Sequence, residues 1–314
     1  MTNGGFSHTS VLLYECIEAL NIRDGFTYVD CTAGGGGHSL EIARRMGKNS
    51  RLICFDRDKS AIAAASERLS DFSDRVTFIN DNFTSLEAVL NDLRIENLGG
   101  VLADLGCSSH QFDTPERGFS YMHDAPLDMR MDVSSPLSAY EVVNGYDENR
   151  LKKIIYDYGE ERFAPRIAST IVARRALGPI KTTGELSDII KSAIPAAKRI
   201  DGPHPAKRTF QAIRIEVNSE LDAIEPLINS ASRALVSGGR LAIISFHSLE
   251  DRIVKQAYKT LASGCSCPKD FPVCVCGKKP VIKEITRKPI LPTDAELEEN
   301  PRARSAKLRV AEKY

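Results

Sequence analysis

Hydrophobic and polar positions in the first hundred residues follow two alternating periods. Short runs of apolar or β-branched residues predict strands at 27–31, 51–56, 75–80 and 100–105. Apolar residues at helical spacing predict helices from His8 to Leu20 and at 37–46, 59–69 and 84–93. Strands that are apolar throughout and alternate with helices are typical of a parallel sheet covered by helices on both faces.

The pattern changes beyond the fourth predicted strand. From about 113 to about 205 the chain is helical and loop-like, with frequent prolines. The alternation then returns as a long amphipathic helix at 209–235, a Gly238–Gly239 turn, an apolar strand at 240–245 and a helix from about 249. We therefore predict an α/β fold, a Rossmann-like doubly wound sheet with an inserted helical domain. The core would comprise 1–112 and 206–314, and the insertion, a domain for substrate recognition, 113–205.

A run of four glycines, Gly34 to Gly37, follows the first predicted strand, which ends in Asp30. Glycine lets a ligand lie against bare backbone, and the helix that follows directs its amide groups outward. The second strand ends in Asp56, 20 residues after Gly36, where such folds place the carboxylate that binds ribose hydroxyls. This combination predicts a cofactor that contains adenosine; the alternative is a purely structural turn.

The residues around the glycines distinguish between cofactors. His38 and Ser39 stand where a phosphate-binding P-loop would have Gly-Lys-Ser/Thr. A carboxylate at Asp30 disfavours a pyrophosphate but suits a ligand with an ammonium and a sulfonium group, such as S-adenosylmethionine. A nicotinamide-dependent oxidoreductase remains an alternative, because Gly34-x-Gly36-x-x-Ser39 nearly fits its pattern.

Polar residues at the strand ends are expected to meet in one crevice, because parallel strands end at the same edge of the sheet. Asp30, Asp56 and Asp104 end the first, second and fourth predicted strands. Phe83 follows the third strand and either contacts the adenine ring or is an ordinary core residue. Asp104 lies where group-transfer chemistry usually occurs, and could bind the methionine ammonium or orient the acceptor.

Several long blocks of sequence resemble one family. They lie at 35–39, 55–58, 104–111, 117–131, 158–163, 204–214, 217–221 and 244–251. From His8 to Arg309 the chain resembles the ribosomal RNA small subunit methyltransferase H (MraW) family, class I methyltransferases that depend on S-adenosylmethionine. The resemblance implies methylation of the exocyclic N4 of a cytidine in the decoding region of 16S ribosomal RNA, and it also implies which residues contact the cofactor. These fall on Gly36, Gly37, His38, Asp56, Phe83, Asp104 and Gln111, of which His38 and Gln111 rest on the resemblance alone.

The chemistry needs a group that accepts a hydrogen bond from the amine, whose lone pair is otherwise delocalised into the ring. Amino-methyltransferases of DNA place an acidic residue or Ser, then Pro-Pro-aromatic, at this strand end. Here the segment reads Asp104-Leu-Gly-Cys-Ser-Ser109, without prolines or an adjacent aromatic. Our hypothesis is that a backbone carbonyl of 107–109 or the Ser109 hydroxyl accepts, while Asp104 holds the geometry. The stacking aromatic would then come from Phe112, Phe119 or Tyr121.

The 42 basic and 42 acidic residues cancel, so any contact with nucleic acid must be local. Lys207, Arg208 and Arg214 are candidates to bind phosphates that flank the target base, and a second basic set lies at 302–309. Ordinary solvated faces are the alternative for both sets. His247, at the end of the fifth predicted strand, is either an RNA contact or a hydrogen-bonded residue that ends the strand.

Cysteines fall into two groups. Cys16, Cys31 and Cys54 occupy apolar positions and are expected in the core. A second group, Cys265, Cys267, Cys274 and Cys276, forms C-x-C-x6-C-x-C in a loop rich in Pro and Lys. Four thiolates could close a structural zinc site, and a reduced thiol-rich loop is the alternative.

The chain has no run of eighteen apolar residues, and its first residues lack the features of a signal peptide. We therefore expect a cytoplasmic protein that does not associate with membranes. The resemblance implies that its partner is 16S ribosomal RNA, within the small ribosomal subunit. DNA is not expected as a substrate. A third class, an RNA-binding assembly factor without catalysis, would need the basic residues but not the glycine turn, Asp30 or Asp56.

Overall fold

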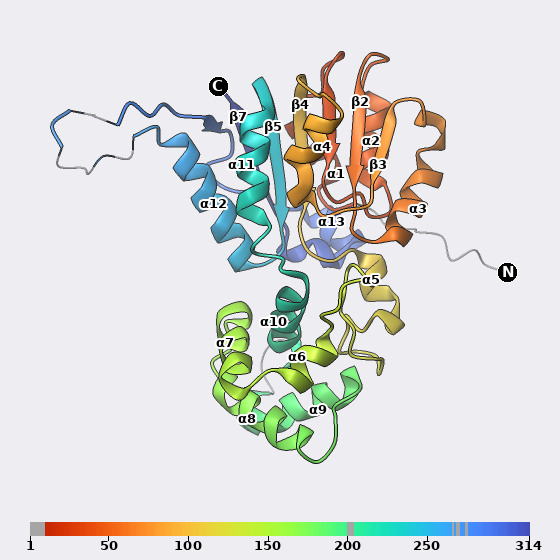
Figure 1. Cartoon of the computed structure of the whole chain (residues 1–314), viewed down its shortest axis with the longest axis vertical. Helices are drawn as coiled ribbons and strands as arrows, with labels where there is room; N and C mark the ends of the chain where they lie inside the picture. Colours follow the sequence, from red (N-terminus) through yellow and green to blue (C-terminus); the bar gives the residue numbers. More distant parts are fainter. Residues whose placement is uncertain (1–9, 200–203, 266, 268–270, 274–275) are drawn as a thin grey trace. The chain divides into compact units, whose positions relative to one another are not determined.

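The computed structural model describes residues 10–199, 204–265, 267, 271–273 and 276–314, apart from the side chain of Ser109. The chain forms two compact units (Figure 1). The sheet unit comprises Met1–Gly106 and Leu221–Tyr314, and the helical unit comprises Cys107–Glu220. The helical unit includes more residues at both ends than the 113–205 expected from the sequence.

The sheet unit contains seven strands, β1 (Thr27–Asp30), β2 (Arg51–Phe55), β3 (Val76–Ile79), β4 (Leu98–Asp104), β5 (Leu235–Ser245), β6 (Ile282–Glu284) and β7 (Lys307–Lys313). Their order in the sheet is β3-β2-β1-β4-β5-β7-β6. Strands β1 to β5 are mutually parallel, whereas β7 runs antiparallel to both β5 and β6. The parallel part confirms the predicted doubly wound α/β fold.

Helices cover both faces of this sheet (Figure 1). They are α1 (Leu13–Leu20), α2 (Gly37–Arg45), α3 (Lys59–Arg68), α4 (Leu86–Asp92), α11 (Ile224–Ala234), α12 (Ser248–Ala262) and α13 (Asp294–Glu299). Adjacent strand residues alternate between the two cores: Tyr28 packs with residues of α1 and α2, and Val29 with residues of α4, α11 and α12. This alternation follows from the period of two in a strand, and explains why each strand is apolar throughout.

The helical unit has its own core and contains α5 (Ser109–Asp113), α6 (Ala139–Gly145), α7 (Glu148–Gly159), α8 (Ala164–Arg175), α9 (Thr183–Ala193) and α10 (Lys207–Asn218). Helix α10 packs against α7 and α6 and buries Phe210 and Ile213 in this core. The helical unit therefore extends to Glu220, past the boundary expected near 205.

Two expectations for the region after 205 are wrong. The predicted helix at 209–235 is two helices in different units, because α10 ends at Asn218 and its C-cap residue, Ser219, has a left-handed backbone with φ of 50°. Gly238 and Gly239 form no reverse turn but lie inside β5, where the pairing with β4 shifts register. Gly238 has φ of 75°, so glycine serves there as a strand irregularity.

Within the part of the chain that the structure describes, no helix combines the length and the apolar character needed to cross a membrane.

Candidate active site

The carboxyl ends of β1, β2 and β4 lie side by side in the sheet and carry Asp30, Asp56 and Asp104. Successive strands extend in one direction from β1 to β3 and in the other from β4 to β5. The reversal between β1 and β4 is the topological switch point at which open α/β sheets bind ligands. Asp30 and Asp104 end the two strands that flank this point, and Asp56 follows the neighbouring strand. The sequence predicted that these strand ends lie at one edge of the sheet.

The glycines of the turn between β1 and α2 have two different roles. Gly34 has φ of 51°, and a Cβ added there would meet no atom nearer than 4.0 Å, so the turn faces open space at this point. A Cβ at Gly36 would lie 2.9 Å from Leu69 and 3.1 Å from Ala65, and one at Gly37 would collide with the Ser10 hydroxyl. Gly36 and Gly37 therefore let α2 approach its neighbours closely.

Asp56 is held by the backbone at the mouth of this turn. The amides of Gly34 and Asp58 donate to its two carboxylate oxygens, each at 2.8 Å. Burial raises the pKa of Asp56 to about 6, although these two hydrogen bonds lower it. The carboxylate is thus oriented before any ligand arrives, which suits its predicted contact with ribose hydroxyls.

Asp30 and His38 are buried below the turn. The Ser39 hydroxyl donates to Asp30 at 2.6 Å and the Thr32 amide at 3.1 Å, while burial raises the pKa of Asp30. His38 Nε2 lies 3.0 Å from the carbonyl oxygen of Val11, which can only accept, so this nitrogen carries the proton. Burial lowers the pKa of His38. The His38 ring therefore already has a backbone partner, and its contact with the cofactor stays a prediction.

Asp104 differs from the other two aspartates. Its amide donates to the Thr32 hydroxyl at 2.7 Å, but its Oδ1 is buried without a hydrogen-bond partner among the residues that the structure describes. Burial raises the pKa of Asp104 well above its usual value, and the charges of Asp30 and Glu250 raise it further. A buried carboxylate oxygen of this kind calls for a donor or a cation from a ligand.

Phe83 starts a short 3-10 helix (Phe83–Ser85) after β3, and Asn82 caps it by accepting from the Thr84 amide at 3.1 Å. Its ring is half-buried and packs against the core that contains Leu86. One side of Phe83 therefore belongs to the core, and contact of the ring with adenine stays a prediction.

Ser109 and Gln111 both lie in α5 of the helical unit. Ser108 and Gln111 form a capping box, in which the Ser108 amide donates to Gln111 Oε1 at 3.1 Å and the Gln111 amide to the Ser108 hydroxyl at 3.3 Å. The side chain of Gln111 is buried. The side chain of Ser109 lies outside the description, so its catalytic role stays a prediction.

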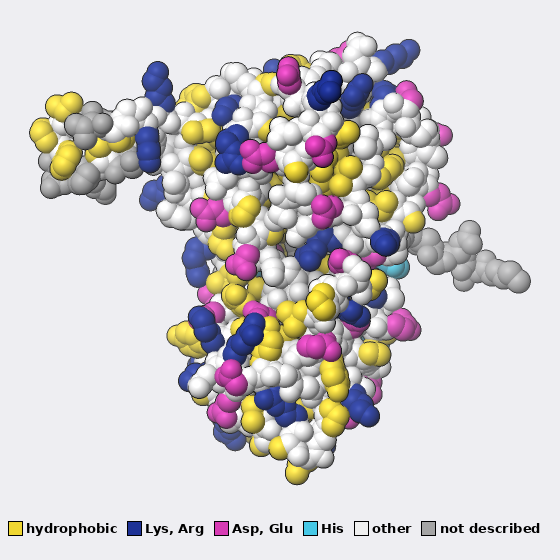
Figure 2. All heavy atoms as spheres, viewed as in Figure 1, with side chains coloured by type: hydrophobic (Ala, Val, Ile, Leu, Met, Phe, Trp, Pro, Cys, Tyr) yellow, Lys and Arg dark blue, Asp and Glu magenta, His cyan; other side chains and the backbone are white. Residues whose placement is uncertain are grey.

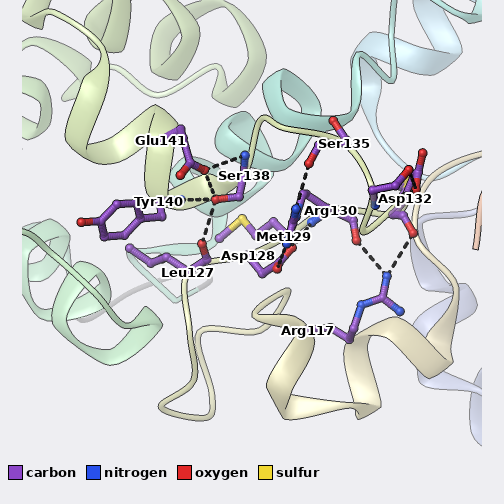
Figure 3. Close-up of polar contacts among 12 residues, drawn as sticks. Arg117, Leu127, Asp128, Met129, Arg130, Asp132, Ser135, Ser138, Tyr140 and Glu141 are labelled. Carbon is purple, nitrogen blue, oxygen red and sulfur yellow. Dashed lines mark hydrogen bonds and ion pairs between the residues drawn. The ribbon is translucent and has the colours of Figure 1, made fainter.

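The block at 117–131 acts as a scaffold within the helical unit (Figure 3). Arg117 donates to the carbonyls of Arg130 and Met131 at 2.8 and 3.1 Å, and Arg130 forms an ion pair with Asp128 at 2.7 Å. Asn218 at the end of α10 accepts from the Met131 amide at 2.8 Å. These bonds fix an irregular segment by satisfying its backbone, and give Arg117, Asp128 and Arg130 structural roles in the block.

All three candidate stacking aromatics have partners inside the helical unit. Phe119 is buried and meets Phe112 edge-on, with ring centroids 6.2 Å apart. Tyr121 stacks on His204 at 4.4 Å with an angle of 7° between the rings. Sequence reasoning missed His204 as the partner, because a contact between residues so far apart leaves no local signal. Phe112 also lies 6.0 Å from the guanidinium of Arg214.

The basic residues of α10 differ in how their charges are used. Lys207 and Arg208 are exposed in the first turn, and Arg208 donates to the Glu160 carbonyl at 3.1 Å. Arg214 forms two hydrogen bonds of 2.9 Å to the carboxylate of Glu220, and both side chains are largely buried, at 13% and 6% exposure. The structure thus supplies an internal partner for Arg214, whereas Lys207 and Arg208 remain accessible to phosphate.

His247 and the second basic set have structural contacts in the sheet unit. His247 caps α12: its Nδ1 accepts from the Glu250 amide at 3.4 Å, while Glu250 Oε2 accepts from the His247 amide at 3.2 Å. Arg309 in β7 is buried and pairs with Asp251 at 2.7 Å, and Lys307 lies 3.5 Å from the same carboxylate. Pairing within the sheet unit accounts for these two members of the set at 302–309.

The cysteines expected in the core, Cys16, Cys31 and Cys54, are buried. Of the predicted zinc ligands, Cys265, Cys267 and Cys276 have sulfur atoms within 4.8 Å of one another. Cys274 lies outside the described residues.

Comparisons with known proteins agree along the whole chain. A profile of the MraW methylase family matches residues 5–314. The ribosomal RNA small subunit methyltransferase H of Clostridioides difficile (strain 630) is 60% identical over 98% of this chain and 99% of its own length. The protein of the same name from Brevibacillus brevis is 56% identical over the full length of both chains. The one from Symbiobacterium thermophilum is 55% identical over 98% of this chain and 97% of its own.

Proposed function

The chain belongs to the MraW methylase family, and we propose that it transfers a methyl group from S-adenosylmethionine to the exocyclic N4 of a cytidine in the decoding region of 16S ribosomal RNA. The observation that carries this proposal is the group of three carboxylates at the ends of β1, β2 and β4. They surround an open glycine turn and include the buried, unpartnered Oδ1 of Asp104.

The donor groups fit S-adenosylmethionine. Asp56, already oriented by two amides, would accept from the ribose hydroxyls, and the open space at Gly34 leaves room for the ligand beside the backbone. Asp104 would accept from the ammonium, which would satisfy Oδ1. Three acids whose pKa values are all raised by burial favour a ligand with positive charge, since cations stabilise their ionised forms.

S-adenosylmethionine supplies an activated methyl group, so the residues of the chain need only position the acceptor. Asp104 would hold the reacting groups in place, and the chain then reaches Ser109 within five residues. A backbone carbonyl of 107–109 or the Ser109 hydroxyl would accept the N–H of the amine and recover the nitrogen lone pair for attack. The proton leaves to solvent with or after methyl transfer.

The RNA would bind through the helical unit, whose role in substrate recognition we propose from its basic residues. Lys207 and Arg208 expose their charges at the start of α10 and would contact phosphates that flank the target. On the face drawn in Figure 2, basic side chains are interspersed with acidic ones over both units. Binding would therefore rely on a few local contacts and on an unstacked base. We place this reaction on the small ribosomal subunit, in the cytoplasm.

Calorimetric titration of the full chain with S-adenosylmethionine, with NAD as control, tests the cofactor. Binding of S-adenosylmethionine alone is expected, and binding of NAD alone would contradict the proposal. Methylation of small-subunit RNA, mapped by mass spectrometry, then tests the target. Ser109→Ala should slow a single turnover without weakening cofactor binding; an unchanged rate would leave the backbone carbonyls as the acceptor.

A further inference from the structure

Three thiols converge in the loop between α12 and β6 of the sheet unit. Cys265, Cys267 and Cys276 each contribute one sulfur to a group whose members lie within 4.8 Å of one another. Cys265 is exposed, and the other two are half-buried. These residues take no part in the methyl transfer proposed above. Exposed thiols that bind no ligand are prone to oxidation.

Backbone contacts at the base of the loop bring the thiols together. The Val281 amide donates to the Leu261 carbonyl at 2.8 Å, so the end of α12 lies beside the start of β6. Gly264 allows a closer approach, because a Cβ at this position would lie 2.6 Å from the nitrogen of Pro280. These contacts hold the two ends of the loop side by side just outside Cys265 and Cys276.

The distance between two of the sulfurs fits a shared metal ion. Cys265 Sγ and Cys276 Sγ lie 3.8 Å apart. Zinc–sulfur bonds of about 2.3 Å in tetrahedral geometry separate two sulfur ligands by about 3.8 Å. A disulfide would require a separation of about 2.0 Å. The pair is therefore spaced as two ligands of one zinc ion are.

One backbone amide lies beside these sulfur atoms. The Cys267 amide lies 3.4 Å from Cys265 Sγ and directs its N–H toward that sulfur, which stabilises a thiolate ligand from outside the metal shell. Lys278 and Lys279 follow two residues after Cys276 and are exposed. Three thiolates and one divalent ion would carry a net negative charge, and these two lysines are basic residues close to Cys276 in sequence.

We propose that Cys265, Cys267 and Cys276 bind a structural zinc ion that fastens the two sides of this loop to each other. On binding, each thiol loses its proton to solvent and its sulfur donates an electron pair to the metal, with no change in oxidation state. The sequence offers a further cysteine at 274, outside the described residues. The site lies apart from the residues assigned to methyl transfer, so its test is independent of the proposed function.

Elemental analysis of the full chain, purified under reducing conditions without chelator, is the first measurement. We expect about one zinc ion per chain. Cys265→Ser and Cys276→Ser should each lose most of it, whereas the control Ser263→Ala, at an exposed residue that follows α12, should retain it. Binding of S-adenosylmethionine by each variant checks that the sheet unit has folded.

Replacement of zinc by Co²⁺ in the unmodified chain gives a second measurement that does not depend on variants. Intense sulfur-to-cobalt charge-transfer absorption with a tetrahedral visible spectrum is expected, and its intensity counts the thiolates as three or more. Fewer than three thiolates would overturn the proposal. So would a chain that takes up no zinc when fully reduced, or a mass two hydrogens lower with no metal, which would identify a disulfide instead.

Discussion

The strand ends of the sheet unit and helix α10 of the helical unit both concentrate charge, but the two regions use their charges differently. At the strand ends, amides orient the carboxylate of Asp56 and the Oδ1 of Asp104 has no partner among the described residues. In α10, the most buried cation, Arg214, is fully engaged by Glu220. A buried charge without an internal partner indicates a ligand, whereas a buried charge with one indicates a structural role.

Removing the ribose contact should have the largest effect. Asp56→Ala would remove the two hydrogen bonds that the ribose hydroxyls are proposed to donate to the carboxylate, each of about 1.5–3 kcal/mol. The affinity for S-adenosylmethionine should therefore fall at least roughly a hundredfold. Calorimetry measures this, and Asp92→Ala, an exposed acid on α4, is the control. Equal affinities for Asp56→Ala and the unmodified chain would place the ligand elsewhere.

Breaking the buried ion pair between Arg214 and Glu220 tests whether this pair has a structural role. Arg214→Ala leaves the Glu220 carboxylate buried and unpaired, and should lower the free energy of unfolding by about 3 kcal/mol. Urea denaturation followed by circular dichroism measures the loss. The double variant R214M/E220L should recover most of it, because no unpaired charge remains. A loss in Arg214→Ala below about 0.5 kcal/mol, the range of ordinary surface substitutions, would remove the structural role.

Acidification should weaken the cofactor site in a defined range. The raised pKa of Asp56, about 6, means that its carboxyl is ionised above this pH and becomes protonated below it. Since the ionised form is the better acceptor and attracts the cationic ligand, affinity for S-adenosylmethionine should fall by up to tenfold for each pH unit below about 6. Asp56→Asn should bind weakly at every pH and show a flatter profile; an equally steep profile would assign the titration to another group.

The smallest effect is expected at the exposed end of α10. Arg208→Ala should weaken RNA binding a few-fold and reduce the slope of log affinity against log salt by about 0.7–0.9, as expected for one lost phosphate contact. Affinity for S-adenosylmethionine should stay the same. Lys153→Ala is a matched control, because Lys153 is an exposed base on α7 that already pairs with Asp157 at 2.6 Å. If both variants keep the full slope, α10 does not contact phosphate.

Sequence reasoning was most successful where the signal is local. Asp30, Asp56 and Asp104 were placed at one edge of the sheet, because apolar runs mark the strands and parallel strands end together. The same reasoning could not find Val11 as the partner of His38, nor Glu220 as the partner of Arg214. Both partners are chosen by packing, which leaves no trace in the periodicity of either segment.

The sequence by itself determined the parallel strands, the position of the glycine turn and the acids at the strand ends, since these follow from the apolar periods of the segments and from local residue types. Only the tertiary structure decided that the helix ends before Ser219, that the chain enters the sheet unit at Leu221 and that β7 pairs antiparallel with β5. Ser219 carries no helix-breaking signal, and the pairing of β7 depends on contacts across many residues of sequence. Local periodicity therefore specifies the helices and strands, while long-range packing determines which of them lie together. Packing also determines that Arg214 has an internal partner in Glu220, whereas Asp104 Oδ1 has none among the described residues.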